Sequence, residues 1–175
     1  KDINSYDYAI IAVGAHNMEM PIPHDNSNIV SSWDVLNGQE VTGDCVVIGG
    51  GLVGAETAEY LANKGHQVTI VEMMDKIAAG ESTTVLPLMM KDFADHNVKQ
   101  LVNTKVDHIE NNIVYTANEQ IKADTIINAL GSKKNIFDDS SITIPHVYVG
   151  DCSGERTADI ASAIRTAYKA ANAID

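Results

Sequence analysis

The stretch VVIGGGLVGAETAEYLANKGHQVTIVE, residues Val46–Glu72, decides the fold of this chain. It begins with a continuous apolar run, typical of a strand buried on both faces of a parallel sheet, which ends at Gly49. A segment with helical periodicity follows, and Gly65 occupies the position of a helix C-cap glycine. A second apolar strand at residues 67–72 completes a strand–helix–strand unit. This order predicts a parallel sheet with helices packed against it.

Three glycines form a G-x-G-x-x-G pattern between the first strand and the helix. Gly49 permits the sharp turn from strand to helix, and Gly51, which has no Cβ, lets a pyrophosphate approach the backbone. Gly54 lets the helix pack closely on the strand. The pattern alone is weak, but its position between a strand and a helix favours a dinucleotide or another ligand that contains ADP.

The first helical turn and the acid after the second strand complete the predicted site. The N–H groups of residues 51–54, including those of Leu52 and Val53, are expected to bind a diphosphate at the positive end of the helix dipole. Glu72 ends the second strand, where a carboxylate accepts hydrogen bonds from ribose hydroxyls and repels a 2′-phosphate. The site therefore favours NAD over NADP, and Lys76 is the basic residue near enough in sequence to weaken that preference.

Composition limits the other partners of the chain. Its 175 residues carry 24 acidic and 12 basic side chains, for a formal net charge of −12. Such a surface repels phosphate backbones and anionic lipid, so neither nucleic acid nor a membrane is an expected partner. No signal peptide is expected at the start, and no apolar run approaches the ~20 residues of a membrane helix, so we expect a cytoplasmic protein.

Other chemistries find little support in the sequence. Cys45 and Cys152 stand alone without a CxxC motif, so we expect two core thiols rather than a redox disulfide or a metal site. The six histidines form no HxxxH or HExxH pair, and we expect no metal ligand. No serine lies in a nucleophile-elbow context, so a hydrolase is not favoured and no catalytic residue is assigned.

The remaining segments predict further elements around the central unit. Residues 8–13 are expected to form a strand, and residues 14–44 a loop that contains Trp33. Beyond Glu72, we expect a helix over 83–96, a short strand over 98–101, a small antiparallel meander over 104–123, an apolar strand over 125–131, and a strand over 146–151 followed by a helix with one apolar face.

Four segments resemble the two-dinucleotide-fold flavoproteins, also called pyridine nucleotide–disulfide oxidoreductases. YDYAIIAVGA (6–15) is similar to the element where such chains leave the FAD domain, and IVSSWDVL (29–36) to the crossing linker. TIINALGS (125–132) is similar to the element where the chain returns, and VYVGDC (147–152) to a late element beside FAD. The likeness is greatest to the carboxyl-terminal region of the 2,4-dienoyl-CoA reductase, 2-enoate reductase, NADH oxidase and trimethylamine dehydrogenase group.

The resemblance implies an organisation in three pieces. Residues 1–40 would be a remnant of an FAD-type domain with the crossing linker, 41–131 an NAD(H)-binding domain, and 132–175 a second FAD-type remnant. The fold class is then α/β, a Rossmann-like parallel sheet with helices on one or both faces and a small antiparallel meander. A further fingerprint for FAD is missing, so we expect a fragment of a larger protein whose own FAD site is incomplete.

The resemblance also implies roles for four residues. Gly14 would border the FAD pyrophosphate, and Asp151 would bond to the FAD linker, although a helix-capping role for Asp151 is an equal alternative. Gly131 would lie at the cofactor, and Glu56 near the nicotinamide, with a solvated helix face as the alternative for Glu56. The family's redox-active cysteine pair is missing, which excludes the disulfide reductase branch.

Two functions are open at this point. The first is the NAD(H)-binding part of a multi-cofactor flavin-dependent oxidoreductase, which positions nicotinamide for hydride transfer to flavin. The second is a non-catalytic module that holds ADP or AMP, as trimethylamine dehydrogenase-like proteins suggest. A simple single-Rossmann dehydrogenase is disfavoured, because no substrate domain with a general acid follows. The expected partners are the other parts of the parent polypeptide, an FAD half-domain and an FMN-type barrel.

Overall fold

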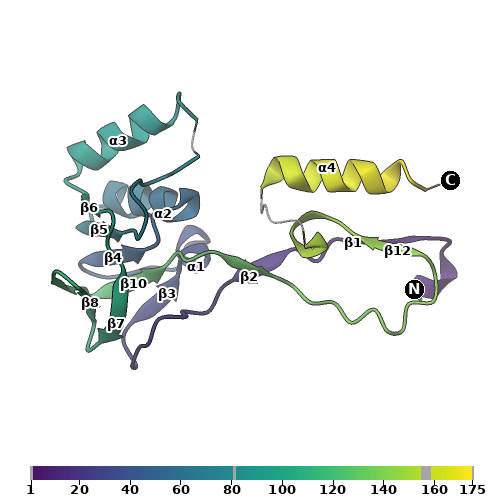
Figure 1. The fold of residues 1–175 in the computed structure, drawn as a ribbon, viewed down its shortest axis with the longest axis horizontal. Coiled ribbons are helices and arrows are strands. Elements are labelled where there is room, and N and C mark those ends of the chain that lie inside the picture. Colours follow the sequence, from purple (N-terminus) through teal and green to yellow (C-terminus); the bar gives the residue numbers. More distant parts are fainter. Residues whose placement is uncertain (1, 81, 155–158, 175) are drawn as a thin grey trace. The chain divides into compact units, whose positions relative to one another are not determined.

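The chain folds into two compact units in a computed structural model that describes residues 2–80, 82–154 and 159–174. The central unit comprises Asn17–Gly131, and the terminal unit comprises Lys1–His16 together with Ser132–Asp175. Strands β2 (Ala15–Asn17) and β11 (Ser132–Lys134) pair where the chain leaves and re-enters the terminal unit. Figure 1 shows the elements of each unit.

A five-stranded parallel sheet forms the centre of the central unit, in the order β3–β10–β4–β5–β6. Its strands are β3 (Ile29–Ser31), β10 (Thr125–Asn128), β4 (Cys45–Ile48), β5 (Val68–Val71) and β6 (Lys99–Leu101). All four residues of β4 and of β10 are buried, which explains the continuous apolar sequence of β4 and the two isoleucines in the middle of β10. The predicted α/β class with a parallel sheet is confirmed.

The two faces of this sheet have separate apolar cores. Alternate residues of β4 point to opposite faces, so Val47 joins one core with helix α2, and Val46 joins the other with the meander. The first core is covered by α1 (Ser32–Leu36), α2 (Leu52–Asn63) and α3 (Leu86–Asp95). The second is covered by the antiparallel strands β7 (Val106–Glu110), β8 (Ile113–Thr116) and β9 (Gln120–Lys122). Helices therefore cover one face and the meander covers the other (Figure 1).

Several local predictions are confirmed with shifted ends. The helix expected over 83–96 begins at Leu86, which places Pro87 in the first turn, where the missing N–H of proline costs no hydrogen bond. Gly65 follows α2 with a φ of 92°, as a C-cap glycine requires. The expected loop over 14–44 is only partly a loop, because it contains β3 and α1.

The terminal unit is smaller. Strand β1 (Ala9–Ile11) pairs in parallel with β12 (His146–Tyr148), and the short 3-10 helices η1 (Ile3–Ser5) and η2 (Gly150–Ser153) flank them. Helix α4 (Ile160–Ala171) is capped by Asp159, whose side chain accepts the N–H of Ser162. Asp151 lies in the first turn of η2 and does not cap α4.

The apolar face predicted for the last helix is present but is not covered within the terminal unit. Ile160, Ile164 and Tyr168 are 80%, 64% and 69% exposed. The buried face of α4 consists of Ser162, Thr166 and Ala170. Helical periodicity located the stripe, but it did not determine which face packs on the neighbouring backbone.

The boundary between the two compact units falls inside the first predicted piece, residues 1–40. Residues 1–16 belong to the terminal unit, whereas residues 17–40 belong to the central unit, since β3 adds to the central sheet beside β10. The assignment of 1–40 and 132–175 as FAD-type remnants, and of 41–131 as an NAD(H) domain, stays a prediction. Among the described residues, no helix has both the length and the apolar character needed to span a bilayer.

Candidate functional site

The candidate site lies where the strand order of the central sheet reverses. From β4 the chain proceeds through α2 to β5 and then through α3 to β6, while β10 returns on the other side of β4. Open parallel sheets bind ligands in the crevice outside the carboxyl ends of the strands at such a point. Here the crevice is bordered by Gly49 after β4, Glu72 after β5 and Gly131 after β10.

Two of the three fingerprint glycines are required by close packing. A Cβ on Gly49 would lie 2.5 Å from the carbonyl oxygen of Ala129, and the φ of Gly49 is 102°. A Cβ on Gly54 would lie 1.9 Å from the carbonyl oxygen of Gly49. These glycines therefore bring β10, β4 and α2 together at the crevice.

Gly51 has a different environment. A Cβ built on it meets no atom within 4 Å, so the space beside this backbone is open and part of the crevice. Gly51 is the N-cap of α2 and forms no side-chain capping bond. The first hydrogen bond into the helix is from Ala55 N–H to the Gly51 carbonyl, so the N–H groups of residues 52–54 have no intrahelical acceptor. This geometry is suited to an anion held by main-chain amides.

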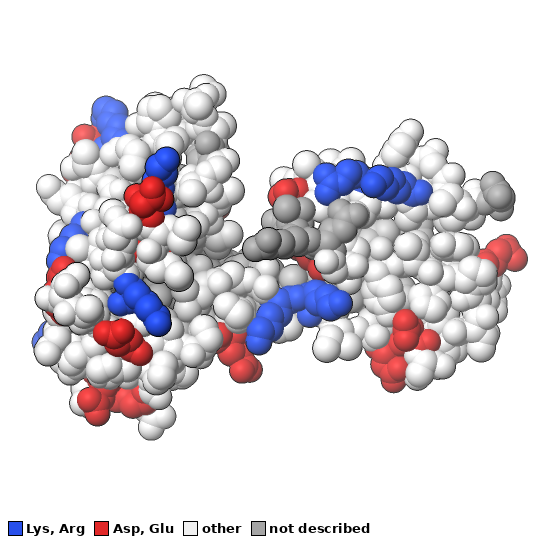
Figure 2. Space-filling model, in the orientation of Figure 1, with Lys and Arg blue, Asp and Glu red and all other residues white. Residues whose placement is uncertain are grey.

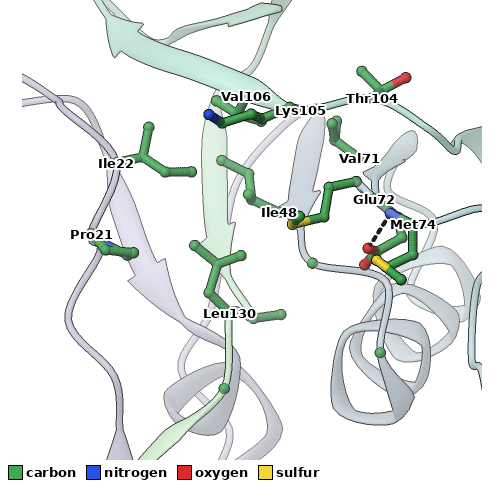
Figure 3. Close-up of a pocket in the computed structure, with 15 residues that line it drawn as sticks. Pro21, Ile22, Ile48, Val71, Glu72, Met74, Thr104, Lys105, Val106 and Leu130 are labelled. Carbon is green, nitrogen blue, oxygen red and sulfur yellow. Dashed lines mark hydrogen bonds between the residues drawn. The ribbon is translucent and has the colours of Figure 1, made fainter.

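Glu72 is held in place by two backbone groups. One carboxylate oxygen accepts the Gly50 N–H at 2.6 Å, and the other accepts the Met74 N–H at 2.7 Å. The second bond is the dashed line in Figure 3. Glu72 is 9% exposed and lines the crevice. A carboxylate oxygen accepts more than one hydrogen bond, so Glu72 keeps the capacity to accept bonds from a ligand hydroxyl.

The crevice encloses a cavity of about 490 Å³ with mostly apolar walls (Figure 3). A cavity of this size suits a small-molecule ligand or cofactor. Its walls come from the strand ends, the segment before β3 and the start of β7: Pro21, Ile22, Ile48, Gly49, Gly51, Val71, Glu72, Met73, Met74, Thr104, Lys105, Val106, Ala129, Leu130 and Gly131.

Sequence reasoning missed part of this wall. Pro21 and Ile22 lie in the predicted loop, and they reach the cavity because the Ile109 N–H of β7 donates to the Pro23 carbonyl at 2.9 Å. The basic residue at the cavity is Lys105, whereas Lys76 is not among its lining residues. Lys105 immediately precedes β7 in the meander, and nothing in its local sequence distinguishes it from other surface lysines.

The cavity does not include all the residues predicted for it. Leu52 and Val53 are each 40% exposed in the first turn of α2, and their side chains do not line the cavity. Glu56 is exposed on α2, also outside the lining. Gly14 and Asp151 belong to the terminal unit, where Gly14 has a φ of 70° and its carbonyl accepts the Asn135 N–H at 2.9 Å.

Titratable groups elsewhere have structural explanations. Burial, with Asp44 and Asp124 nearby, raises the pKa of the Cys45 thiol to about 11, as expected for a core thiol on β4. Cys152 is buried too. Within the described ranges, no three His, Cys, Asp or Glu side chains cluster as a metal would require. On the face of the central unit in Figure 2, acidic and basic side chains are interspersed among uncharged ones.

Comparison with known proteins identifies the class that this fold and crevice define. The family model for "Pyridine nucleotide-disulphide oxidoreductase" matches residues 2–146. The chain belongs to the pyridine nucleotide–disulphide oxidoreductase family, which confirms the resemblance inferred from its motifs.

The relatives include reductases, oxidases and dehydrogenases. Bilirubin reductase of Mediterraneibacter gnavus is 44% identical over 177 residues, which cover 96% of this chain and 28% of that protein. NADH oxidase of Thermoanaerobacter brockii is 48% identical over 80 residues, covering 42% of this chain and 12% of that protein. A solved 2-naphthoyl-CoA reductase complex has a TM-score of 0.79 at 27% identity and covers 93% of this chain and 26% of its own. The chain thus spans little more than a quarter of the length of the bilirubin reductase and of the 2-naphthoyl-CoA reductase, each of which it matches over most of its own length.

Proposed function

We propose that this chain is the NAD(H)-binding portion of a flavin-dependent oxidoreductase. In this proposal the amides of residues 51–54 bind the pyrophosphate, and Glu72 binds the ribose of the adenosine half. Gly49 and Gly131 are expected to lie against the cofactor at the ends of β4 and β10. A flavin-dependent redox function is a property of the family, while the choice of NAD(H) is our inference from this crevice.

The main support for the proposal is the open space beside Gly51. Side chains or backbone fill the space beside Gly49 and Gly54, yet the helix end at Gly51 faces a cavity with unbonded amides around it. An acidic chain of net charge −12 binds an anion best where main-chain dipoles, rather than side chains, supply the positive field. The residues present therefore fit a dinucleotide diphosphate.

In the whole protein, the bound nicotinamide would supply a hydride, that is, two electrons and a proton, to a flavin. This chain would position the cofactor. The amides would hold the diphosphate and Glu72 would hold the ribose, so that the nicotinamide end is directed away from the crevice. We further propose that Gly14 and Asp151 border FAD in the whole protein, and that Glu56 faces the nicotinamide side. No acid or base from this chain is needed for such a transfer, and we expect the 175-residue chain alone to oxidise no NADH.

The test is a set of titrations with the 175-residue chain. We expect NADH to bind with a higher affinity than NADPH, because the Glu72 carboxylate repels a 2′-phosphate. Gly51→Ala adds a methyl group in the path of the pyrophosphate and is expected to weaken NADH binding about tenfold or more, equal to ~1.4 kcal/mol. Its unfolding midpoint, followed by the fluorescence of Trp33, should stay close to that of the unmodified chain, because the added Cβ meets no atom within 4 Å. Equal NADH affinity of the two chains would refute the proposal.

Glu72→Gln tests the ribose contact. The amide keeps one acceptor oxygen but directs an NH2 group toward one of the two backbone N–H donors. We expect weaker NADH binding and a smaller preference for NADH over NADPH, since the charge that repels the 2′-phosphate is removed. Glu110→Gln, at the exposed end of β7, is the matched control and should change neither affinity. An unchanged NADH/NADPH ratio in Glu72→Gln would assign the preference to another group.

One observation favours a second candidate, a module that holds ADP or AMP without redox chemistry. The cavity walls surround the adenosine and diphosphate side of the proposed ligand, and Glu56, assigned to the nicotinamide side, is not among them. If ADP competes with NADH at equal affinity, so that nicotinamide contributes nothing to binding, this second function is favoured. A higher affinity for NADH than for ADP favours the first.

We also propose that the parent polypeptide covers the apolar face of α4. This face exposes Ile160, Ile164 and Tyr168, and the M. gnavus relative is more than three times as long as the segment matched here. The expected result is slower amide hydrogen exchange in α4 within the longer protein than in the 175-residue chain. Equal exchange rates would show that this face stays open to solvent.

A further inference from the structure

Two methionines form an exposed pair at the edge of the nucleotide cavity. Met73 and Met74, called here the methionine pair, follow Glu72 directly and both line the cavity. They are 65% and 59% exposed. All six methionines of the chain lie among the described residues, and the other four, Met18, Met20, Met89 and Met90, are half-buried or buried.

The pair is coupled to the ligand side of the crevice through the backbone. The Met74 N–H donates to the Glu72 carboxylate at 2.7 Å, so the turn that carries both thioethers also helps to fix that carboxylate. Figure 3 shows Met74 and Glu72 projecting from this same turn toward the cavity. A chemical change on the pair therefore acts within one or two residues of the proposed ribose contact.

We propose that the methionine pair is an oxidation site that controls nucleotide affinity, with hydroperoxides as the oxidant; this inference rests on the proposed function. The thioether sulfur gives two electrons to one peroxide oxygen, the O–O bond breaks and an S–O bond forms. The other peroxide oxygen leaves as water when the oxidant is hydrogen peroxide, with no net uptake of protons. The product, methionine sulfoxide, is reduced back by methionine sulfoxide reductases.

The change in polarity is the reason why oxidation is expected to lower the affinity for the nucleotide. A thioether is apolar and polarisable and makes favourable contacts with a flat aromatic ring. A sulfoxide is polar and accepts hydrogen bonds, and it would lie beside Glu72, which is itself an acceptor. Ile48, Val71 and Leu130 in the wall offer no side-chain donor, and the lysine and threonine donors that line the cavity are those of Lys105 and Thr104. A nucleotide base that lies against the pair would lose an apolar contact on oxidation, and the sulfoxide would place a second negative dipole near the carboxylate.

The other sulfur groups are less exposed to the same oxidant than the methionine pair. Cys45 and Cys152 are 1% and 4% exposed, and burial raises the pKa of the Cys45 thiol to about 11, so little reactive thiolate forms there. Met89 is 2% exposed within the core between α3 and the sheet. Because its thioethers are the most exposed, the methionine pair is expected to react first with a hydroperoxide.

The experiment treats the 175-residue chain with hydrogen peroxide and maps sulfoxides by peptide mass spectrometry. We expect oxidation first at Met73 and Met74, and slower oxidation of both when NAD⁺ is bound. The Kd for NADH should rise about two- to tenfold, the size of a lost sulfur–aromatic contact, and treatment with both sulfoxide reductases should restore it. In Met73→Leu/Met74→Leu the ratio of the treated to the untreated Kd should be close to one, whereas Met90→Leu should keep the full response.

Three results would overturn the inference. The first is an unchanged Kd although both residues carry sulfoxides, and the second is a full peroxide response in the double leucine variant. These two leave the proposed function intact, because NADH binds before oxidation. The third is a chain that binds no NADH before treatment, which overturns the proposed function and this inference together.

Discussion

Helices α2 and α4 have the same length of 12 residues and contrasting environments. α2 buries six residues, and Leu61 among them is 1% exposed. α4 buries Ser162, Thr166 and Ala170, while Ile160 and Ile164 remain open to solvent. The first helix contacts a sheet whose residues it closely complements, and the second presents its apolar face outward. An apolar stripe therefore indicates that a surface needs a partner, but it does not indicate that the partner belongs to the same unit.

The same contrast distinguishes the two units. In the central unit, apolar cores lie on both faces of the sheet, and Gly49 and Gly54 allow backbone to pack against backbone at the crevice. In the terminal unit the described strands form only two-stranded pairs, β1 with β12 and, at the border of the unit, β11 with β2. We expect the central unit to be rigid and stable, and the terminal unit to open more readily.

The largest effect is expected from filling the helix–strand contact. In Gly54→Ala the new Cβ would lie 1.9 Å from the Gly49 carbonyl oxygen, and backbone atoms have to shift to relieve the clash. We expect a loss of about 3 kcal/mol in the free energy of unfolding, although alanine itself favours a helix by ~1 kcal/mol. Urea unfolding followed by Trp33, which lies in α1 of the central unit, measures the change. Gly51→Ala is the matched control, and a similar loss in both variants would contradict this interpretation of the fingerprint.

Side-chain truncation on the two helices tests their difference directly. Leu61→Ala in α2 leaves a cavity between the helix and the sheet and should cost about 2–5 kcal/mol. Ile164→Ala in α4 removes a side chain that is 64% exposed, and a change within about 0.5 kcal/mol is expected in the 175-residue chain. The first is measured by urea unfolding with Trp33 and the second by hydrogen exchange in α4. A large loss for Ile164→Ala would show that its face is covered.

The labelling rates of the two cysteines show how readily each unit opens within one molecule. Cys45 lies on the central strand β4, and Cys152 lies in η2 of the terminal unit, where its thiol contacts the Ile11 carbonyl at 3.4 Å. Both are buried, so a thiol reagent reacts only when the surrounding structure opens. We expect Cys152 to react about tenfold faster or more, which corresponds to ~1.4 kcal/mol less for opening the terminal unit. The single variants Cys45→Ala and Cys152→Ala assign each phase, and faster labelling of Cys45 would reverse the proposed order of stability.

Much of the central unit is encoded locally, and the sequence predicts it well. The βαβ segment 45–72 and the meander follow from periodicity and glycine positions, and the helix expected over 83–96 is present as α3 with a start shifted to Leu86. Strand β3 was missed because it is short and depends on pairing with β10, and helix α1 was missed because it has only five residues. A signal was present in S-S-W-D: the Ser31 hydroxyl accepts the Asp34 N–H at 3.0 Å and donates to its carboxylate at 2.6 Å, a local capping arrangement.

The candidate site was predictable where one segment builds it. Gly49, Gly51 and Glu72 could be named because the strand–helix–strand unit brings them together. Pro21, Ile22 and Lys105 could not, since they reach the cavity only through the pairing of the segment before β3 with β7. Contacts between segments far apart in sequence have no local pattern, so the apolar wall opposite Glu72 had to come from the structure.

The smallest expected effect concerns a carboxyl pair between two helices of the central unit. Burial and the nearby Asp92 of α3 raise the pKa of Glu59 on α2 above its ordinary value of 4.5, with a smaller contribution from Glu56. Above that value the folded chain keeps a proton that the unfolded chain has lost, so the free energy of unfolding should decrease as the pH rises through this window. The change is expected to stay below about 1 kcal/mol, because the pair is partly solvated.

Glu59→Gln isolates this contribution from the general effect of the acidic surface. Glutamine resembles the protonated carboxyl, so the variant should match the original chain at pH 4 and exceed it in stability at pH 7, as measured by urea unfolding with Trp33. Glu110→Gln removes one acidic charge at the exposed end of β7 and should leave the pH dependence unchanged apart from that charge. If Glu59→Gln and Glu110→Gln change the pH profile equally, the Glu59 carboxyl between α2 and α3 makes no specific contribution to the pH dependence. The contrast between the buried α2 and the open α4 then depends on apolar packing alone.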